Sequence, residues 1–418
     1  MTRPHYKGLT IDPKGSEDLD DAVWVEKTQD GFVVRVSISD ATAWVKVGSE
    51  ADARAHDRLS SRYYPKRTRH LLPDYIATDL ASLLPGKPKK ALTMAIHLKH
   101  NLEVTGDPRI RLSYVESRRL SYSDIPTILT DREHPLFQQV GLLSSIAKEL
   151  ARGRGKSTPL PFYDLPKGFV VTEEGIPREI PADETIGHVI VREMMVLANF
   201  TLARFCRDVG VPILYRSHQL RRSVDPDLAR LVSQNGNGKL DFKKVNLVRA
   251  RMGIIVPRAR YDTRPKQHAG LGLPVYTHGT SPLRRRADMI VHRQVKAWLG
   301  GSDYPYDLED LKRIVDHINA RSEEMDESHA YLHRRWEPHI KVSQRPMEVL
   351  ALWAQKVGEL KLPTYEITGV EQDSKGRPIY TCTCAMAKLK RSGTGRSRTE
   401  AKNAAARAVW NVLFAENR

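Results

Sequence analysis

A dense group of carboxylates near the start of the chain is the first feature that could do chemistry. The stretch TIDPKGSEDLDDAV contains five acidic residues, four of them aspartates: Asp12, Asp18, Asp20 and Asp21. Carboxylates packed together repel one another, and burial makes their ionisation still less favourable. A hard divalent cation relieves this repulsion, and Mg²⁺ is usually held by a few carboxylates together with substrate phosphate and water. The alternative is an exposed acidic turn, and spacing alone leaves both interpretations open.

Two other metal sites do not fit the sequence. A calcium-binding EF-hand loop needs Gly at its sixth position and Glu at its twelfth. The loop that starts at Asp12 has Glu17 and Val23 there. A zinc site needs more ligands than three cysteines offer, and Cys382 and Cys384 alternate with threonines as strand residues do.

The overall composition indicates a globular protein with an anionic partner. The chain has 418 residues, of which 40% are hydrophobic and 28% charged. It carries 67 Lys and Arg against 50 Asp and Glu, a net charge of +17. Such an excess favours nucleic acid through counterion release. An anionic membrane surface would also attract it, but the sequence has no basic amphipathic anchor, lipidation signal or long apolar run. The charge therefore favours nucleic acid over a membrane as the partner, and three cysteines suit a reducing compartment. We expect a cytoplasmic protein, a monomer with no membrane partner.

Local patterns predict an α+β fold for residues 1–343. Alternating apolar residues predict a hairpin directly behind the acidic cluster and two further strands, at 22–25, 32–38, 92–98 and 109–115. Apolar residues at helical spacing predict three long helices, at 183–207, 284–298 and 307–332. We expect mixed sheets surrounded by helices.

Residues 346–418 have a different character. The pattern predicts a short helix and three strands, at 347–357, 364–370, 378–385 and 386–390. A Gly-rich turn at 392–395 then leads to a final alanine-rich helix at 398–414. This α-β-β-β-α order in about 70 residues can fold as a small independent domain.

The acidic stretch resembles the signature of the RNase II/RNase R (RNB) family of exoribonucleases, roughly ID-x5-D-(F/L/M)-DDA. Further blocks resemble the family in the family's order over roughly Lys7 to Lys341. They are SRYYP (61–65), LLP (71–73), DLASL (79–83), RLSY (119–122), EMMVLAN (193–199), LYRSH (214–218) and YTHGTSPLRR (276–285).

The resemblance implies 3′→5′ hydrolysis of RNA to nucleoside 5′-monophosphates with two metal ions, Mg²⁺ or alternatively Mn²⁺. By position, the metal ligands would be Asp12, Asp18, Asp20 and Asp21. Asp20 would be the carboxylate most needed for chemistry, and Arg284 would grip the scissile phosphate, which a fork-shaped guanidinium suits. Glu327 corresponds best to the family's late catalytic glutamate, with Glu323 or Glu324 as alternatives.

Three aromatic residues would hold the RNA end in this family. Tyr63 and Phe162 would stack on the terminal bases, and Tyr122 would help to position the end. Stacking tolerates every base, which suits an enzyme that digests any sequence. The duller alternative is that these residues pack in the core. For Arg284, the alternative is that the run of three arginines from 284 to 286 is a solvated face.

The chain departs from the family at its two ends. Members usually carry oligonucleotide-binding barrels before and after the catalytic block, and we expect none here, because that block begins almost at Met1. Within the block, Gly279 and Arg286 stand where the family often has aromatics, and we expect them to widen the site.

The C-terminal part resembles a double-stranded RNA-binding domain, which reads A-form shape more than sequence. Its candidate phosphate contacts are Lys388, Lys390, Arg396, Arg398 and Lys402, with Arg391 nearby. The loop at 373–377 lacks the usual Gly-Pro-x-His reader, and Thr399 replaces a usual lysine, so protein contacts are the alternative role. The expected partner is RNA, with single-stranded 3′ ends and structured or duplex regions. The alternative for the whole chain is a catalytically retired RNA-binding scaffold.

Overall fold

The computed structural model describes residues 3–64, 67–157, 169–171, 177–179, 185–219, 259–336, 346–347, 350, 363–374, 376–386 and 389–414. The chain divides into two compact units, Met1–Arg62 with His70–Ser322 and Tyr63–Arg69 with Glu323–Arg418. A functional domain boundary between residues 343 and 346 stays a prediction.

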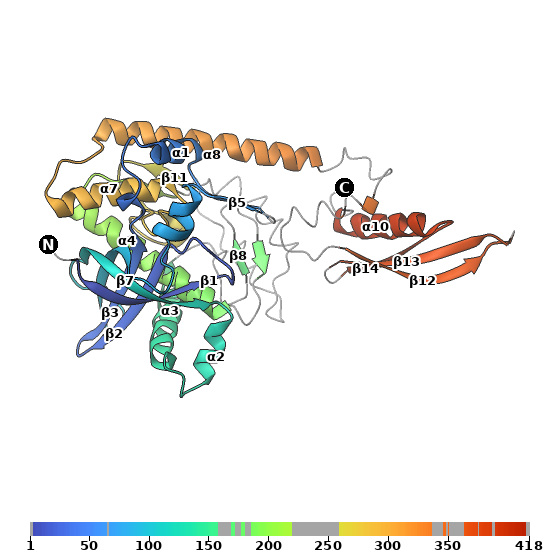
Figure 1. Cartoon of the computed structure of the whole chain (residues 1–418), viewed down its shortest axis with the longest axis horizontal. Helices are drawn as coiled ribbons and strands as arrows, with labels where there is room; N and C mark the ends of the chain where they lie inside the picture. The colour runs from blue at the N-terminus through green and yellow to red at the C-terminus, as the bar shows by residue number, and fades with distance from the viewer. Residues whose placement is uncertain are drawn as a thin grey trace. The chain divides into compact units, whose positions relative to one another are not determined.

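A closed five-stranded barrel forms the centre of the first unit (Figure 1). Its strands, in spatial order, are β1 (His5–Asp12), β2 (Asp21–Thr28), β3 (Gly31–Ser39), β6 (Lys89–Lys99) and β7 (Arg109–Ser121). Neighbouring strands are antiparallel except for β1 and β7, which run parallel and close the barrel. The four predicted strands are confirmed, and each extends beyond its predicted bounds. Neither β1 nor the closure was predicted.

The turn between β2 and β3 requires glycine. Gly31 has φ +148°, and a Cβ there would lie 2.0 Å from the carbonyl oxygen of Leu98 on β6. No side chain fits at that distance, so Gly31 lets three strands approach one another at this end of the barrel.

Helices cover the barrel and supply the rest of the core. They are α1 (Glu50–Arg58), α2 (Asp124–Thr130), α3 (Phe137–Ser157), α4 (Thr185–Val209), α7 (Arg286–Gly300) and α8 (Leu308–Trp336). The three predicted long helices are thereby confirmed, and the proposed cap Asp183 lies outside the described residues. Buried residues of the barrel strands, α3, α4 and α7 form one continuous apolar cluster.

Helix α4 is long and apolar enough to cross a membrane by length and composition, with a mean hydropathy of 1.3. However, 61% of its apolar window is buried inside the protein, where it belongs to the same cluster as α3 and the barrel. We interpret it as the core helix of the first unit. No other helix among the described residues meets these criteria.

In the second unit, α10 (Arg398–Phe414) covers one face of an antiparallel sheet of β12 (Thr364–Gln372), β13 (Pro378–Met386) and β14 (Leu389–Gly395) (Figure 1). Most of the helix expected at 347–357 lies outside the described residues. The prediction of a Gly-rich turn at 392–395 was wrong, since these residues belong to β14. A Cβ on Gly393 would lie 2.3 Å from the backbone nitrogen of Ala405. The glycines therefore allow close contact between strand and helix.

Candidate active site at the end of the barrel

The antiparallel pairing of two strands brings the acidic residues together. β1 ends at Asp12 and β2 begins at Asp21, and their register pairs Leu9 with Val23. The last residue of β1 therefore lies beside the first residue of β2. Asp18 and Asp20 occupy the connection between them.

This connection is held in place by a neighbouring segment. Ser82 Oγ accepts a hydrogen bond from Leu19 N at 3.0 Å and donates one to the carbonyl of Glu17 at 2.6 Å. Leu83 N also donates to the carbonyl of Leu19. The side chain of Leu19 is fully buried, whereas Glu17 is exposed. Glu17 therefore points to solvent, and Ser82 fixes the loop, a role that its sequence context does not reveal.

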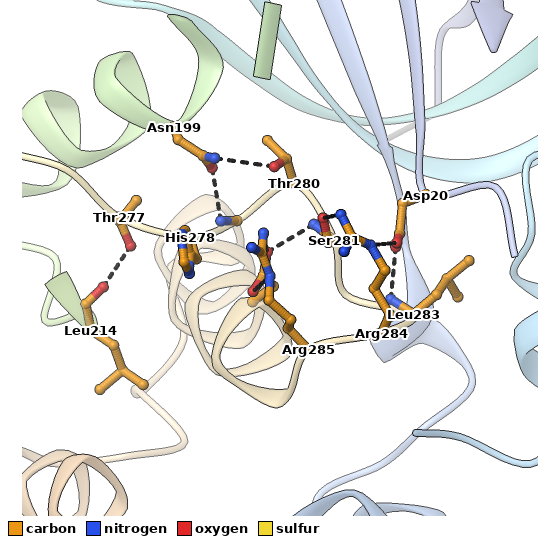
Figure 2. Close-up of polar contacts among 12 residues, drawn as sticks. Asp20, Asn199, Leu214, Thr277, His278, Thr280, Ser281, Leu283, Arg284 and Arg285 are labelled. Atoms are coloured by element: carbon orange, nitrogen blue, oxygen red, sulfur yellow. Dashed lines mark hydrogen bonds and ion pairs between the residues drawn. The ribbon is translucent and has the colours of Figure 1, made fainter. Parts of the chain in front are cut away.

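Asp20 is the most buried of the four aspartates, with 4% of its surface exposed. Its Oδ1 accepts a hydrogen bond from the backbone nitrogen of Leu283 at 2.8 Å. Its Oδ2 lies 3.3 Å from Nε of Arg284 and has no hydrogen-bond donor among the described residues. Figure 2 shows both partners converging on this carboxylate. The structure thus brings Asp20 and Arg284 together from positions 264 residues apart.

The three arginines of the run at 284–286 have different environments, so they are not a solvated face. Arg284 is partly exposed, and its guanidinium contacts Asp20 and donates to Ser281 Oγ at 3.0 Å. Arg285 makes two hydrogen bonds of 3.0 Å to the buried Asp288. Arg286 is 7% exposed, and its Nε and NH1 have no hydrogen-bond partner among the described residues.

Burial and mutual repulsion raise the pKa values of the carboxylates. Burial raises the pKa of Asp12 to about 6, and Asp18 adds to the rise while Arg119 and Arg284 oppose it. Burial and the charge of Asp12 raise the pKa of Asp21 to about 8. The pKa of Asp20 is also raised well above its ordinary value, mainly by burial, against the opposing effect of Arg284. The nearby arginines therefore compensate the negative charge of these three aspartates only in part.

The donor set fits a hard divalent cation. Three carboxylates resist ionisation, and one buried carboxylate oxygen lacks a hydrogen-bond donor. Oxygen ligands of this kind are those that Mg²⁺ prefers. Nevertheless, the described part of the chain contains no group of three or more His, Cys, Asp or Glu side chains that could hold a metal ion as they stand. The ligand set therefore stays a proposal.

A buried polar network positions the loop that carries Arg284. Asn199 of α4 accepts a hydrogen bond from Gly279 N at 2.9 Å and donates to Tyr276 Oη and Thr280 Oγ1, both at 3.1 Å. His292 of α7 donates from Nε2 to the carbonyl of Gly279 at 2.7 Å. Figure 2 shows Asn199 above this loop. Asn199 lies in one of the family-like blocks, but only the folded structure reveals what it holds.

The expectation that Gly279 widens the site was wrong. A Cβ on Gly279 would lie 2.7 Å from a methyl group of Leu202, so the space beside the glycine is filled. Arg286 is buried rather than facing an open cleft. A cavity of about 810 Å³ lies elsewhere, between α3, α4 and the β6–β7 turn, and none of the predicted site residues is among the described residues that line it.

The remaining predicted residues of the catalytic block differ in how far the structure describes them. Tyr122 directly follows β7 and stacks on His188. Tyr63 lies on the short strand β4 (Arg62–Tyr64), is 55% exposed and groups with the second unit. Phe162 lies outside the described residues, and Glu327 is placed on α8 by its backbone alone, as are Glu323 and Glu324.

In the second unit, basic residues gather on β14 and at the start of α10. Lys390, Arg396 and Arg398 are exposed, Lys402 is partly buried, and Lys388 lies outside the described residues. Ser397 and Glu400 cap α10: Ser397 Oγ accepts from Glu400 N at 3.1 Å, and Glu400 accepts from Arg396 N at 2.8 Å.

Comparison with known proteins assigns the family. Residues 5–301 match the RNB domain. The chain belongs to the RNB family. Residues 346–413 match the double-stranded RNA binding motif. The expected fold class, an RNB-type α+β fold with a C-terminal double-stranded RNA-binding domain, is thereby confirmed.

Curated relatives of this RNB protein are ribonucleases. Ribonuclease R of Aquifex aeolicus is 30% identical over 356 residues, which cover 77% of this chain and 50% of that protein. Exoribonuclease 2 of Baumannia cicadellinicola is 28% identical over 320 residues, covering 70% of this chain and 50% of that protein. The chain thus spans about half the length of these relatives. RNB ribonucleases generally depend on a divalent metal.

Solved structures share the fold. Mycoplasma genitalium RNase R in complex with ribose methylated single-stranded RNA has a TM-score of 0.64 at 20% identity, covering 94% of this chain and 63% of that chain. An active-site mutant of the Dss1 exoribonuclease from Candida glabrata has a TM-score of 0.68 at 19% identity, covering 94% and 51%. Yeast Ssd1, a pseudonuclease, has a TM-score of 0.60 at 20% identity, covering 95% and 52%. Active and inactive proteins therefore share this architecture, and activity must be argued from the site.

Proposed function

We propose that this chain is an active 3′→5′ exoribonuclease that hydrolyses RNA to nucleoside 5′-monophosphates in the cytoplasm. The observation that carries the proposal is the meeting of Asp20 and Arg284 at the end of the barrel that holds Asp12 and Asp21. A scaffold that only binds RNA has no need for buried carboxylates with raised pKa values beside an arginine, because such a cluster is unfavourable without a task.

The proposed roles follow from the contacts. Arg284 is oriented by Asp20 and Ser281, so its guanidinium is preorganised to stabilise charge that develops on the scissile phosphate. Mg²⁺ or Mn²⁺, held by Asp12, Asp18, Asp20 and Asp21, would supply an activated water and neutralise the leaving oxygen. Asp20 has a second task, since its hydrogen bond from Leu283 N ties the acidic loop to the arginine loop.

The test is a gel assay on single-stranded RNA and 3′-tailed duplex RNA in the presence of Mg²⁺ or Mn²⁺, with 5′-labelled strands to follow the shortening and uniformly labelled strands to identify the released products. Wild type should shorten both from the 3′ end and release nucleoside 5′-monophosphates, and Asp20→Asn should stop this. Asp79→Asn is the matched control, because the side chain of Asp79 is 72% exposed. It should keep full activity. RNA that stays intact with wild type and metal would refute the proposal.

The same assay decides the second candidate, a retired RNA-binding scaffold. The observation that favours the scaffold is the chain's similarity in fold to yeast Ssd1, a pseudonuclease. Metal-independent RNA binding without turnover would favour it. A matched DNA strand in parallel lanes reports whether the site also cuts DNA.

For the second unit we propose recruitment of structured RNA by the basic residues on β14 and α10. Lys390, Arg396 and Arg398 are exposed, which suits contact with phosphates across a groove. The neighbouring β12–β13 turn contributes less, because Arg377 is held by Asp373 through hydrogen bonds of 2.9 and 3.1 Å. We therefore expect weak affinity for duplex RNA. Binding of full-length protein to a blunt duplex, compared with a single strand, tests this.

A further inference from the structure

Tyr122 is stacked on a histidine that has no assigned role. The ring centroids of Tyr122 and His188 are 3.8 Å apart, and the ring planes meet at 23°. His188 lies in the first turn of α4, and Tyr122 follows the last residue of β7. That last residue, Ser121, pairs with Asp12 across the strands that close the barrel. The stack therefore stands next to the proposed metal-binding end of β1.

The neighbouring Gly187 makes this contact possible. A Cβ on Gly187 would lie 2.9 Å from Cδ1 of Tyr122 and 3.0 Å from its Cα, closer than a side chain tolerates. The first turn of α4 therefore lies directly against the backbone and ring of Tyr122. On the other side, the following turn fixes the backbone, because Asp124 accepts a hydrogen bond from Ser121 N at 2.7 Å.

We infer that His188 is a positioning residue, whose stacked ring holds Tyr122 in the one orientation in which it contacts the 3′-terminal nucleotide. The inference rests on the proposed function and on the role at the RNA end that the family resemblance implies for Tyr122. A tyrosine at the end of a strand has several side-chain rotamers, and stacking on a ring fixed in a helix selects one of them before RNA arrives. Such preorganisation by a supporting ring is what precise contacts in a site require.

The experiment measures kcat and KM on single-stranded RNA for His188→Ala, His188→Phe and His5→Ala. Loss of the stack in His188→Ala should lower kcat/KM by about 2- to 13-fold, the range that corresponds to one aromatic pair. His188→Phe keeps a flat ring and should restore wild-type values. His5→Ala is the matched control. It removes a stack on Tyr114, with centroids 5.1 Å apart, from the opposite end of the β1–β7 pair, and should change nothing.

A double-mutant comparison separates positioning from general structure. If His188 acts through Tyr122, His188→Ala should have no further effect in a Tyr122→Ala background. Additive losses, or equal losses in His188→Ala and His188→Phe, would overturn the inference. If His188→Ala does not fold, Gly187→Ala serves instead, since its Cβ displaces the same ring and should lower kcat/KM similarly.

The same variants are compared for binding to single-stranded RNA without metal. This decides the inference even if wild type does not cut RNA, the outcome that would refute the proposed function alone. Binding that weakens in His188→Ala and recovers in His188→Phe would support the inference. Wild-type affinity in His188→Ala would overturn it.

Discussion

Asn199 should be essential for activity although it lies outside the proposed chemistry. Its side chain is 2% exposed and makes three hydrogen bonds, all to the loop that carries Arg284. Each such bond contributes about 0.5–1.5 kcal/mol net, so Asn199→Ala should lower the free energy of unfolding by about 2–4 kcal/mol. The backbone N–H of Gly279 would lose its acceptor, which drives the loop to rearrange. A displacement of about 1 Å at a reacting group can lower the rate by about 100-fold.

Gln294 provides the matched control on the adjacent helix α7. It is fully buried and also makes three hydrogen bonds, to the carbonyls of Pro212 and Tyr306 at 2.9 Å and from Tyr306 N at 3.3 Å. Gln294→Ala should therefore destabilise the protein as much as Asn199→Ala but leave kcat unchanged. Urea unfolding gives the stability, and RNA hydrolysis at a temperature where both variants are folded gives kcat. Equal effects of the two substitutions on kcat would refute the reasoning.

Three further predictions concern buried charge, metal and duplex RNA. Arg286→Met should leave the free energy of unfolding unchanged or raise it, because two nitrogens of this buried guanidinium have no hydrogen-bond partner among the described residues. Arg293→Met should lower the free energy of unfolding by about 3–5 kcal/mol, because it leaves buried Asp52 and Tyr306 without their partner. Urea unfolding measures both, and similar losses in the two variants would contradict this. Asp12 and Asp21 have folded pKa values of about 6 and 8, above the ordinary 3.8, so without metal the folded state binds more protons and their contribution to stability falls as pH rises toward 8. Because metal competes with those protons, Mg²⁺ should raise the Tm more at pH 8 than at pH 6. A larger rise in Tm at pH 6 would contradict the assignment of these aspartates as metal ligands. Arg398→Ala should weaken duplex RNA binding and reduce the slope of log K against log salt concentration by about 1 in a salt titration. An unchanged slope would show that Arg398 does not contact the RNA.

The sequence identified the aspartates of the acidic loop and Arg284 as candidate site residues, but it did not identify the residues that hold them in place. Asp20 and Arg284 could be assigned to one site in advance because both lie in blocks that resemble a known family, whereas their direct contact is seen only in the structure. The hydrogen bond from Leu283 N to Asp20 could not be predicted, since every residue type except proline has a backbone N–H and the residue pattern does not show which one is used. Ser82 and Asn199 escaped for a related reason: each acts on backbone groups that are distant in sequence.

The fold shows the same division between local and distant interactions. Strands β2 and β3 alternate apolar residues and are joined by a short turn, so a local pattern was enough. The parallel contact of β1 with β7 joins residues more than 100 positions apart, and no local period predicts it. Gly393 was mistaken for a turn residue because glycine serves equally for a turn and for close packing, and only the approach of α10 distinguishes the two uses.

The backbone around Arg284 connects the parts of the proposed site. The carbonyl of Arg284 accepts a hydrogen bond from Ser61 N at 2.9 Å. Two residues further on, Arg286 N donates a hydrogen bond to the carbonyl of Leu59 at 2.9 Å. Leu59, the C-cap that follows α1, has φ +59°, an unfavourable conformation for a residue with a side chain, which persists only where surrounding contacts enforce it. The strain lies where α1 turns toward the arginine loop, two residues before Ser61. This short backbone pairing fixes the loop that carries Arg284, and Leu283 of the same loop holds the carboxylate of Asp20. Any change that shifts this pairing should affect phosphate binding and the acidic loop together.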